Sequence, residues 1–285
     1  MGSGVKTAIP EHDTLAPMKH AFFHGPHPVV LGHRGAAGSA PENTLFAFQE
    51  GLNQGAHVLE SDIQITADGI PILLHDSRVD RTTDGQGEAA DLPLQDIQQL
   101  DAGIRFVPAE GVEPAPRPQE PLRIPTLREA FETYPEAAFN LEIKGESDVL
   151  VSAVVALVQE FEREDRTLLT AGEDPIQHLL REELSRTGST VALGASLADI
   201  LDVIRSAQDG SRPQTDSMAL QIPRFFGDSP LVTPELITHC HRHDIEVHVW
   251  TINETQEMSE LLDLGVDGLV TDLPARLTQL LSDRA

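Results

Sequence analysis

Side chains able to transfer protons and to hold a phosphate follow short apolar runs near the start of the sequence. His33 and Arg34 follow the run Val29–Leu31, and His75 follows a second run that ends at Leu74. Imidazole groups titrate near neutral pH, so two of them can act as acid and base. A guanidinium beside one of them can hold a phosphate through paired hydrogen bonds.

Two carboxylates lie between these histidines. The segment Val58–Ile65 alternates in polarity, which predicts a strand with Glu60 and Asp62 on one face. Two carboxylates that are two residues apart on one face repel each other. A bound cation would relieve that repulsion.

The next predicted strand, Ile70–Leu74, follows Val58–Ile65 too closely for a crossover helix. The two strands must therefore form an antiparallel hairpin around residues 66–69. A turn centred on the two middle residues would place Glu60 opposite His75. A turn centred one residue later would place Asp62 there, so either register brings His75 beside the carboxylates.

The elements that must position these residues alternate regularly along the rest of the chain. Without the hairpin strand, eight strands are predicted, near residues 30, 60, 141, 168, 192, 220, 249 and 269, each followed by a helix or a helix-sized stretch. This pattern predicts a TIM barrel over residues 29–285, with a small insertion at 77–123. The alternative is an open doubly wound sheet. A dinucleotide-binding fold of that kind has a glycine-rich turn after its first strand, and this sequence has none there. Residues 1–28 are expected to be a flexible leader or to lie draped on the domain.

Composition limits the partners that the protein can have. The 285 residues carry a formal charge of −26 and are 40% apolar. The acidic charge argues against a nucleic-acid partner. No apolar run is long enough to span a membrane, and no signal peptide is predicted. The single cysteine, Cys240, suits a reducing compartment, so a cytoplasmic location is expected.

In a TIM barrel, the carboxyl ends of the strands carry the active site. The strand Ala138–Ile143 would add Glu142, with Lys144 directly after it, and the strand near residue 249 would add Trp250. Glu60, Asp62 and Glu142 form a hard-oxygen set suited to Mg²⁺ or Ca²⁺. Lys144 can join Arg34 in holding a phosphate. A single Glu-x-Asp pair is more often a solvated pair on the surface than a functional site. The convergence of all these residues at one end of the barrel favours a functional site.

Other candidate residues are harder to interpret. Asp272 either caps a helix or faces the site, and His248 is either a buried core residue or a site residue. His239, His241 and His243 are spaced by two on a predicted helix. That spacing directs the side chains apart, so they are not predicted to bind a metal.

Several motifs together resemble the glycerophosphodiester phosphodiesterase family. They are His33-Arg34-Gly35, Pro41-Glu42-Asn43-Thr44, Glu60-Ser61-Asp62, Thr66-Ala67-Asp68-Gly69, His75-Asp76, Arg81-Thr82-Thr83-Asp84-Gly85, Leu141-Glu142-Ile143-Lys144, Val249-Trp250-Thr251-Ile252-Asn253 and Thr271-Asp272. The similarity runs from about Val29 to the C-terminus. It is specific in the first half, and between Gly145 and Gly227 it extends only to layout.

The resemblance implies hydrolysis of glycerophosphodiesters to glycerol 3-phosphate and an alcohol. It implies one divalent cation, Mg²⁺ or Ca²⁺, bound by Glu60, Asp62 and Glu142, with His33 and His75 as acid and base. Arg34, Lys144 and Trp250 are the expected substrate-binding residues. The alternatives are a lysophospholipase D acting on single-chain lipids and a non-catalytic binding protein on the same fold. The oligomeric state is not predicted.

Overall fold

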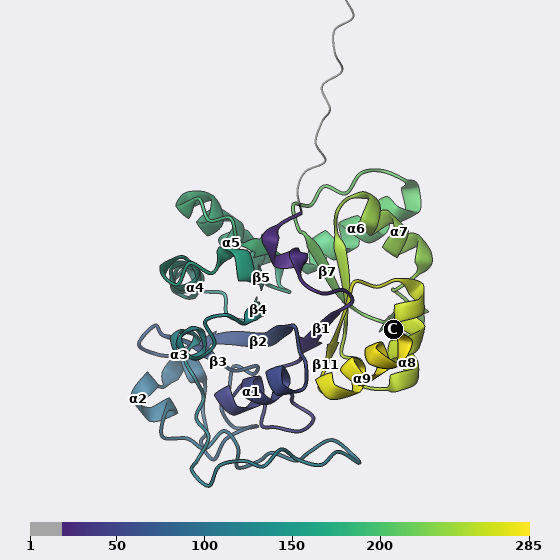
Figure 1. Ribbon diagram of the computed structural model, residues 1–285. Helices are drawn as coiled ribbons and strands as arrows, with labels where there is room; N and C mark the ends of the chain where they lie inside the picture. The colour runs from purple at the N-terminus through teal and green to yellow at the C-terminus, as the bar shows by residue number, and fades with distance from the viewer. Residues whose placement is uncertain (1–18) are drawn as a thin grey trace, which may run out of the picture.

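The computed structural model describes residues 19–285, so most of the expected leader, including His12, lies outside the described residues. The described chain forms a barrel of eight parallel strands surrounded by eight helices (Figure 1). The strands are β1 (Val29–Gly32), β2 (Val58–Ile65), β4 (Ala138–Ile143), β5 (Thr167–Thr170), β6 (Ala192–Leu193), β7 (Ala219–Pro223), β10 (Glu246–Trp250) and β11 (Gly268–Thr271). The helices are α1 (Leu45–Asn53), α3 (Leu127–Thr133), α4 (Asp148–Glu160), α5 (Asp174–Thr187), α6 (Leu197–Asp209), α7 (Pro234–Arg242), α8 (Thr255–Leu264) and α9 (Pro274–Arg284).

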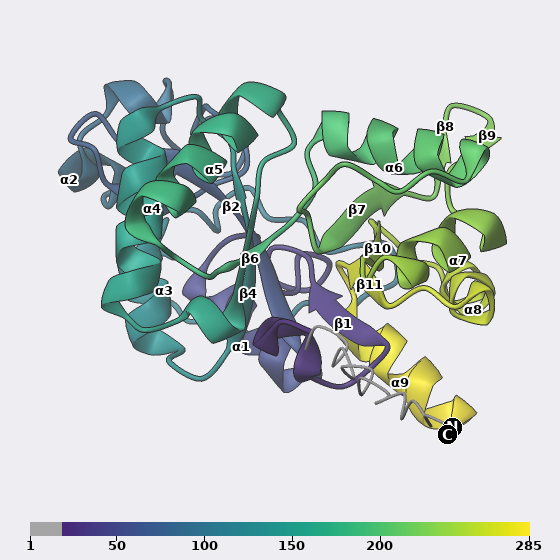
Figure 2. The ribbon, with the colours of Figure 1, turned by 90° about the horizontal axis from the view of Figure 1, so that it is seen from above.

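The strands pair in the order β6-β5-β4-β2-β1-β11-β10-β7. A single parallel bridge between Gly194 and Ala219 joins β6 to β7 and closes the ring. The predicted TIM barrel is therefore confirmed, and its strands lie at the predicted positions. Figure 2 shows the ring of strands from above, with the helices outside it.

Apolar faces of the helices pack on the outside of the ring in two large clusters. One surrounds Phe131 and Phe139, and the other surrounds Val247 and Leu269. Local sequence signals set where the helices begin and end. The Thr44 hydroxyl accepts a hydrogen bond from Ala47 N at the start of α1. Several helices end on a glycine with a left-handed backbone, such as Gly188 after α5.

The hairpin strand β3 (Pro71–Leu73) pairs with β2 as predicted, but both predicted registers are wrong. Ile63 lies opposite Leu73, and Ile65 lies opposite Pro71. The loop has three residues instead of two, because Thr66 N donates to Ile70 O at 3.1 Å. Gly69 completes it with a φ of +81°, the left-handed backbone that such loops require. The extra residue shifts the pairing by one position, so neither Glu60 nor Asp62 lies directly opposite His75.

Residues 77–123 lie between β3 and α3 and run along the lower edge of Figure 1. They contain the short helices η2 (Ala89–Asp91) and α2 (Leu94–Ile97). Val79, Ala89 and Ile97 are buried against Ile72 in a small core of their own. A second hairpin, β8 (Phe225–Phe226) with β9 (Ser229–Pro230), follows β7 and was not predicted from the sequence.

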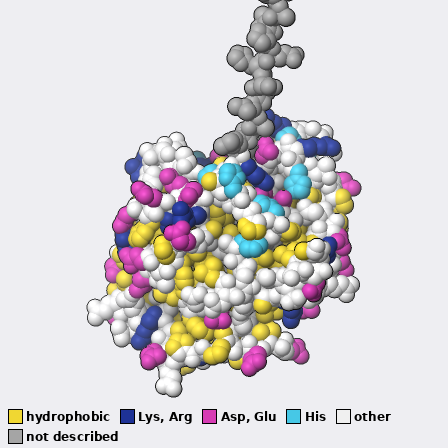
Figure 3. Space-filling view, viewed as in Figure 1, with side chains coloured by type: hydrophobic (Ala, Val, Ile, Leu, Met, Phe, Trp, Pro, Cys, Tyr) yellow, Lys and Arg dark blue, Asp and Glu magenta, His cyan; other side chains and the backbone are white. Residues whose placement is uncertain are grey.

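The opposite end of the barrel is covered by residues 19–28. They include the 3-10 helix η1 (Ala21–His24), whose Phe23 is buried against Leu168, Ala192 and Ala219. This part of the expected leader is therefore draped on the domain. Figure 3 shows several histidine side chains near the grey segment at this end.

Two side chains of the same segment reach the buried carboxylate of Glu246. Lys19 Nζ lies 2.5 Å from Glu246 Oε1, and His27 Nε2 lies 2.9 Å from the same oxygen. The other oxygen, Oε2, accepts from His248 Nε2 at 3.0 Å. Burial would raise the pKa of Glu246, but these partners outweigh it and hold that pKa at about 2. Glu246 therefore stays charged inside the barrel, and His248 is a buried core residue.

Candidate active site

The first catalytic candidates lie on a tight turn that ends β1. Gly35 N donates to Gly32 O at 3.0 Å, and Gly35 has a φ of +94°. A β-carbon on Gly35 would lie 2.5 Å from the backbone of Ala47 in α1, so only glycine allows this close approach. The turn also places Arg34 in a left-handed backbone conformation, with a φ of +50°. His33 and Arg34 are thereby directed towards the barrel mouth.

His33 is held by a carboxylate that comes from the last strand of the barrel. Its Nδ1 donates to Asp272 Oδ1 at 2.6 Å, and its Nε2 lies 4.0 Å from Glu60 Oε2. Burial lowers the pKa of His33, but the hydrogen bond that it donates to Asp272 and the charge of Glu60 outweigh burial and raise that pKa. Asp272 therefore faces the site. It is fixed in turn by Asn253, whose Nδ2 donates to Asp272 Oδ2 at 2.7 Å.

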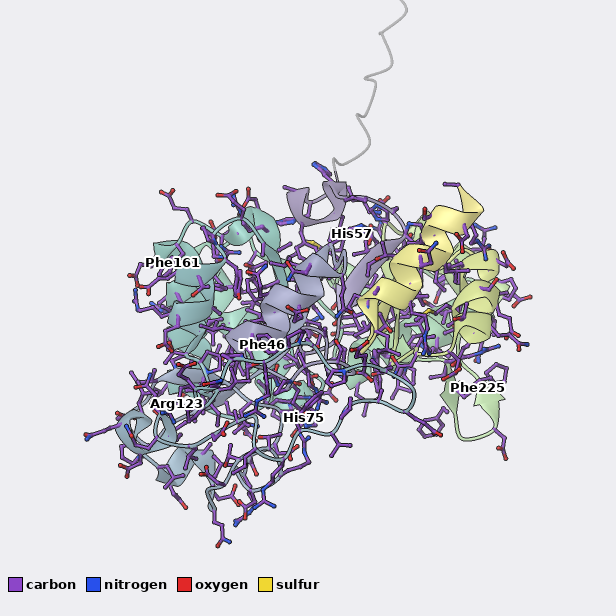
Figure 4. The ribbon with its side chains drawn as sticks, turned by 60° about the horizontal axis from the view of Figure 1, so that its bottom comes forward. Phe46, His57, His75, Arg123, Phe161 and Phe225 are labelled. Carbon is purple, nitrogen blue, oxygen red and sulfur yellow. The ribbon has the colours of Figure 1, made fainter. Side chains whose placement is uncertain are left out.

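His75 is held in the same way on the other side of the mouth. Its Nδ1 donates to Asp76 Oδ1 at 2.7 Å. Asp76 Oδ2 also accepts from Arg81 Nε at 2.6 Å. Burial would raise the pKa of Asp76, but Arg81 and His75 outweigh it and lower that pKa to about 2. Figure 4 shows His75 on the underside of the molecule, with Arg123 of the insertion to one side and Phe225 of the β8–β9 hairpin to the other.

A chain of ion pairs joins the two candidate centres. Arg81 donates to both oxygens of Glu42, at 2.7 and 2.8 Å. Glu42 Oε1 also accepts from Arg34 Nη1 at 2.7 Å. His75 is therefore linked through Asp76, Arg81 and Glu42 to Arg34, although the hairpin register does not pair it with the acidic strand. Burial opposes the charge on Glu42, but the two arginines outweigh it and lower its pKa.

The predicted carboxylates lie on two neighbouring strands. Asp62 of β2 is the direct partner of Glu142 of β4, and Glu60 lies two pairs earlier, beside Asn140. Glu60 is 7% exposed. Burial, together with the charge of Asp62, raises its pKa to about 7. Asn140 is buried as well, and its Oδ1 accepts no hydrogen bond from the described residues.

Basic groups neutralise this acidic cluster in the present arrangement. Lys144 Nζ lies 2.7 Å from Glu142 Oε2 and 3.3 Å from Asp62 Oδ1. Arg34 Nε lies 3.4 Å from the other oxygen of Asp62. Within residues 19–285, no three Asp, Glu, His or Cys side chains converge as a ready metal site. The donors still fit a hard cation, because three carboxylates line adjacent strand positions and one of them is buried at a high pKa.

Several site residues were not identified from sequence reasoning. Glu42, Asn43, Asp76 and Arg81 fell in recognised motifs, but no role in the site was predicted for them. Asn43 Nδ2 donates to Asp62 Oδ2 at 3.2 Å, which helps to fix the acidic strand. The signal for Asp76 was its position directly after a candidate histidine.

The remaining predicted residues separate into site and non-site positions. Trp250 ends β10 and is 45% exposed at the mouth. His239 Nε2 instead lies 2.9 Å from Ser206 Oγ, and His241 Nε2 lies 2.9 Å from Asp267 Oδ2. The three spaced histidines of α7 thus do not form a metal site.

Two histidines lie at one barrel mouth and each is oriented by a carboxylate, an arrangement that hydrolases use for proton transfer. The fold and the site together define the class of the protein, which is a TIM-barrel hydrolase. A family model described as "Glycerophosphoryl diester phosphodiesterase family" matches residues 33–276, and the chain belongs to that family. This confirms the resemblance seen in the sequence motifs and, with it, the prediction of an enzyme.

Similar proteins agree with this assignment over nearly the whole chain. A glycerophosphodiester phosphodiesterase of Caldanaerobacter subterraneus is 29% identical over 257 residues, covering 88% of this chain and 97% of the relative. A lysophospholipase D of Rattus norvegicus is 27% identical, covering 89% of this chain and 86% of the relative. A solved phosphodiesterase of Oleispira antarctica, in complex with its product sn-glycerol-3-phosphate, is 26% identical with a TM-score of 0.73, covering 90% and 97% of the two chains.

Proposed function

We propose that the protein hydrolyses glycerophosphodiesters to glycerol 3-phosphate and an alcohol, with His33 and His75 as the proton-transfer groups. The observation that carries this proposal is the matched pair of hydrogen bonds, His33 to Asp272 at 2.6 Å and His75 to Asp76 at 2.7 Å. A carboxylate only accepts, so each Nδ1 carries hydrogen, and Nε2 is left as the nitrogen that takes up or gives a proton. Both histidines are thus prepared to exchange a proton through Nε2.

Hydrolysis of a phosphodiester needs a base for the nucleophile and an acid for the leaving alkoxide, roughly in line. We assign His33 as the base and His75 as the acid at the start of the reaction. The Asp272 carboxylate favours proton uptake by His33, because it raises the pKa of that imidazole. The nucleophile is either water or the neighbouring glycerol hydroxyl, which would give a cyclic phosphate.

Glu60, Asp62 and Glu142 are the proposed ligands of one divalent cation, Mg²⁺ or Ca²⁺. When bound, the cation would polarise the phosphate and offset its negative charge. Support comes from Glu60, whose pKa of about 7 reflects burial and the charge of Asp62, a repulsion that a bound cation would relieve. Lys144, which lies beside Glu142 and Asp62, would then be available to contact the phosphate.

Arg34 and Lys144 are the proposed phosphate-binding groups. Both are partly buried at the mouth, with side chains 15% and 23% exposed. Nearby carboxylates outweigh the effect of burial and raise the pKa of Lys144, so it remains charged. Trp250 is proposed to contact the rest of the substrate.

A second candidate function is cleavage of lysophospholipids by a lysophospholipase D reaction at the same site. The observation that favours it is the half-exposed Trp250 beside the mouth, which offers an apolar surface to an acyl chain. No helix of the described residues is long and apolar enough to cross a membrane. A cytoplasmic location is part of the proposal and rests on Cys240, a single buried thiol.

A substrate panel tests the proposal. Glycerophosphodiesters of choline, ethanolamine, glycerol and inositol would be assayed beside lysophospholipids, with release of glycerol 3-phosphate as the readout. His33→Ala and His75→Ala should each lower kcat by at least ~10²-fold. His178→Ala, at an exposed position on α5, is the matched control and should keep full activity.

Two results would decide the open points. A substrate whose glycerol lacks the adjacent hydroxyl is hydrolysed only by the water route. If either catalytic variant, folded and loaded with metal, keeps more than about a third of wild-type kcat, the two-histidine assignment is wrong.

A further inference from the structure

The large apolar side chains that are exposed among residues 19–285 all lie at one end of the barrel. They belong to the end of a barrel strand, to the turns, loops and short hairpin that follow the strands, or to the first two turns of the helices that come next. We call them the apolar rim: Ile70, Ile104, Val107, Val149, Leu197, Leu201, Phe225, Phe226 and Trp250. This is the end that carries His33 and His75.

The opposite end differs sharply. As far as the structure describes that end, none of the exposed large apolar side chains lies there, and Phe23 of η1 is buried against the barrel. Single exposed apolar residues are common on soluble proteins and need no explanation. Their restriction to the end that holds the active site is not expected by chance.

The most exposed member, Phe226 at 77%, is presented by an ordered hairpin. The neighbouring Arg224 donates from Nη2 to Glu260 Oε2 at 2.7 Å, which ties the hairpin to α8. The guanidinium of Arg224 also lies 5.1 Å from the centre of the Phe225 ring. Gly227, with a φ of +58°, makes the tight turn between β8 and β9. The aromatic side chain is therefore held outwards instead of folding onto the domain.

Val107, the other extreme at 80% exposed, lies on the insertion. The insertion is fixed to the loop after β1, because Ala109 N donates to Gly38 O at 2.8 Å. In Figure 4, Arg123 of the insertion and Phe225 of the β8–β9 hairpin lie on opposite sides of His75. In Figure 3, apolar side chains appear among the loops at the lower edge of the molecule.

We propose that the apolar rim docks on the surface of a zwitterionic lipid bilayer and brings the barrel mouth against it. The proposal rests on the proposed function, because it concerns how the same site reaches phosphodiesters of amphiphilic lipids. Separate side chains around an opening suit a broad, soft surface, whereas a peptide helix or strand would need one continuous groove. The formal charge of −26 excludes an anionic surface as the preferred one.

Binding to vesicles tests the rim directly. Wild-type protein should cosediment with phosphatidylcholine vesicles, and less with phosphatidylglycerol vesicles. Val107→Ser and Phe226→Ser should each lower the partition coefficient by about threefold to tenfold, because each removes an apolar side chain from the interface. The double variant should hydrolyse soluble glycerophosphocholine within about twofold of wild type, since neither residue contacts the catalytic groups.

A matched control separates location from overall hydrophobicity. Ser211→Phe adds an exposed aromatic at the far end of the barrel, in the loop after α6. Added to Phe226→Ser, it should not restore vesicle binding. Restored binding would overturn the proposal.

Three other results would also overturn it. The first is that wild-type protein does not bind phosphatidylcholine vesicles, and the second is that wild type and the double variant bind them equally. The third is a dimer that Phe226→Ser dissociates, which would assign the rim to a second copy of the chain. Rim-dependent vesicle binding without hydrolysis of any glycerophosphodiester would support the docking surface and overturn the proposed function instead.

Discussion

Asp272→Asn should inactivate the enzyme by forcing His33 into the wrong tautomer. The orientation of the new amide is fixed by Asn253, whose Oδ1 already accepts from Thr271 Oγ1 at 3.0 Å and from Asp272 N at 2.9 Å. Asn253 Nδ2 therefore remains the donor to residue 272. The amide oxygen of the variant must face Asn253, and its NH₂ group must face His33.

The size of the effect follows from this geometry. An NH₂ group facing His33 Nδ1 requires an unprotonated Nδ1, so neutral imidazole carries its hydrogen on Nε2. His33 then cannot accept a proton through Nε2, and we expect kcat to fall by about 10²–10⁴-fold. The change also removes a charge-assisted hydrogen bond of 2.6 Å, which stabilises the fold by roughly 1.5–3 kcal/mol.

The loss of stability should depend on pH. The folded pKa of His33 is raised above its ordinary value of 6.5, so its pairing stabilises the fold fully below that value. The contribution is lost as pH rises through the raised pKa. The difference in melting temperature between wild type and Asp272→Asn should therefore be larger at pH 6 than at pH 9.

Steady-state kinetics and thermal melting over this pH range are the measurements. Asp267→Asn is the matched control, because it alters another histidine–aspartate pair, with His241 Nε2 at 2.9 Å, at the far end of the barrel. That control should keep normal kcat. A folded Asp272→Asn enzyme with more than about a third of wild-type kcat and an unchanged pH profile would refute the tautomer argument.

Three further changes probe the rest of the site. EDTA should abolish hydrolysis, and Mg²⁺ or Ca²⁺ should restore it. Glu60→Gln should weaken cation binding, measured by calorimetry. Full activity in excess chelator would contradict the metal assignment. Arg81→Ala should lower kcat about tenfold or more, because it frees the carboxylate that orients His75, and Arg81→Lys should not rescue it because lysine lacks the paired donors. Lys144→Ala should lower kcat/KM about 10²-fold, whereas the control Lys19→Ala, far from the mouth, should leave it unchanged. If the two variants changed kcat/KM equally, the phosphate would bind elsewhere.

The sequence was sufficient to predict the barrel and to predict which candidate site residues gather at one end of it. Eight strand and helix signals in alternation leave few possible folds, and parallel strands bring their carboxyl ends together. That rule alone gathered His33, Asp62 and Glu142. It works because it needs only the order of elements and the face on which each side chain lies.

The contacts that orient those side chains could not be predicted. Asp272 follows a strand and precedes a helix, and only the position of Asn253 decides that it faces His33. Arg81 and Glu42 are 39 residues apart, and their pairing depends on how an irregular insertion folds over the first loop. The register of the hairpin depended on one residue of loop length, which turn preferences near Gly69 did not settle.

The covering of the barrel floor by residues 19–28 has a consequence for the order in which the chain reaches its final structure. Phe23 rests on residues from β5, β6 and β7, and Lys19 pairs with Glu246 of β10. None of these partners exists while the ribosome is still making the first half of the protein. The segment that leaves the ribosome before any barrel strand is thus among the last to settle, and Phe23 must remain unburied until β7 has been synthesised.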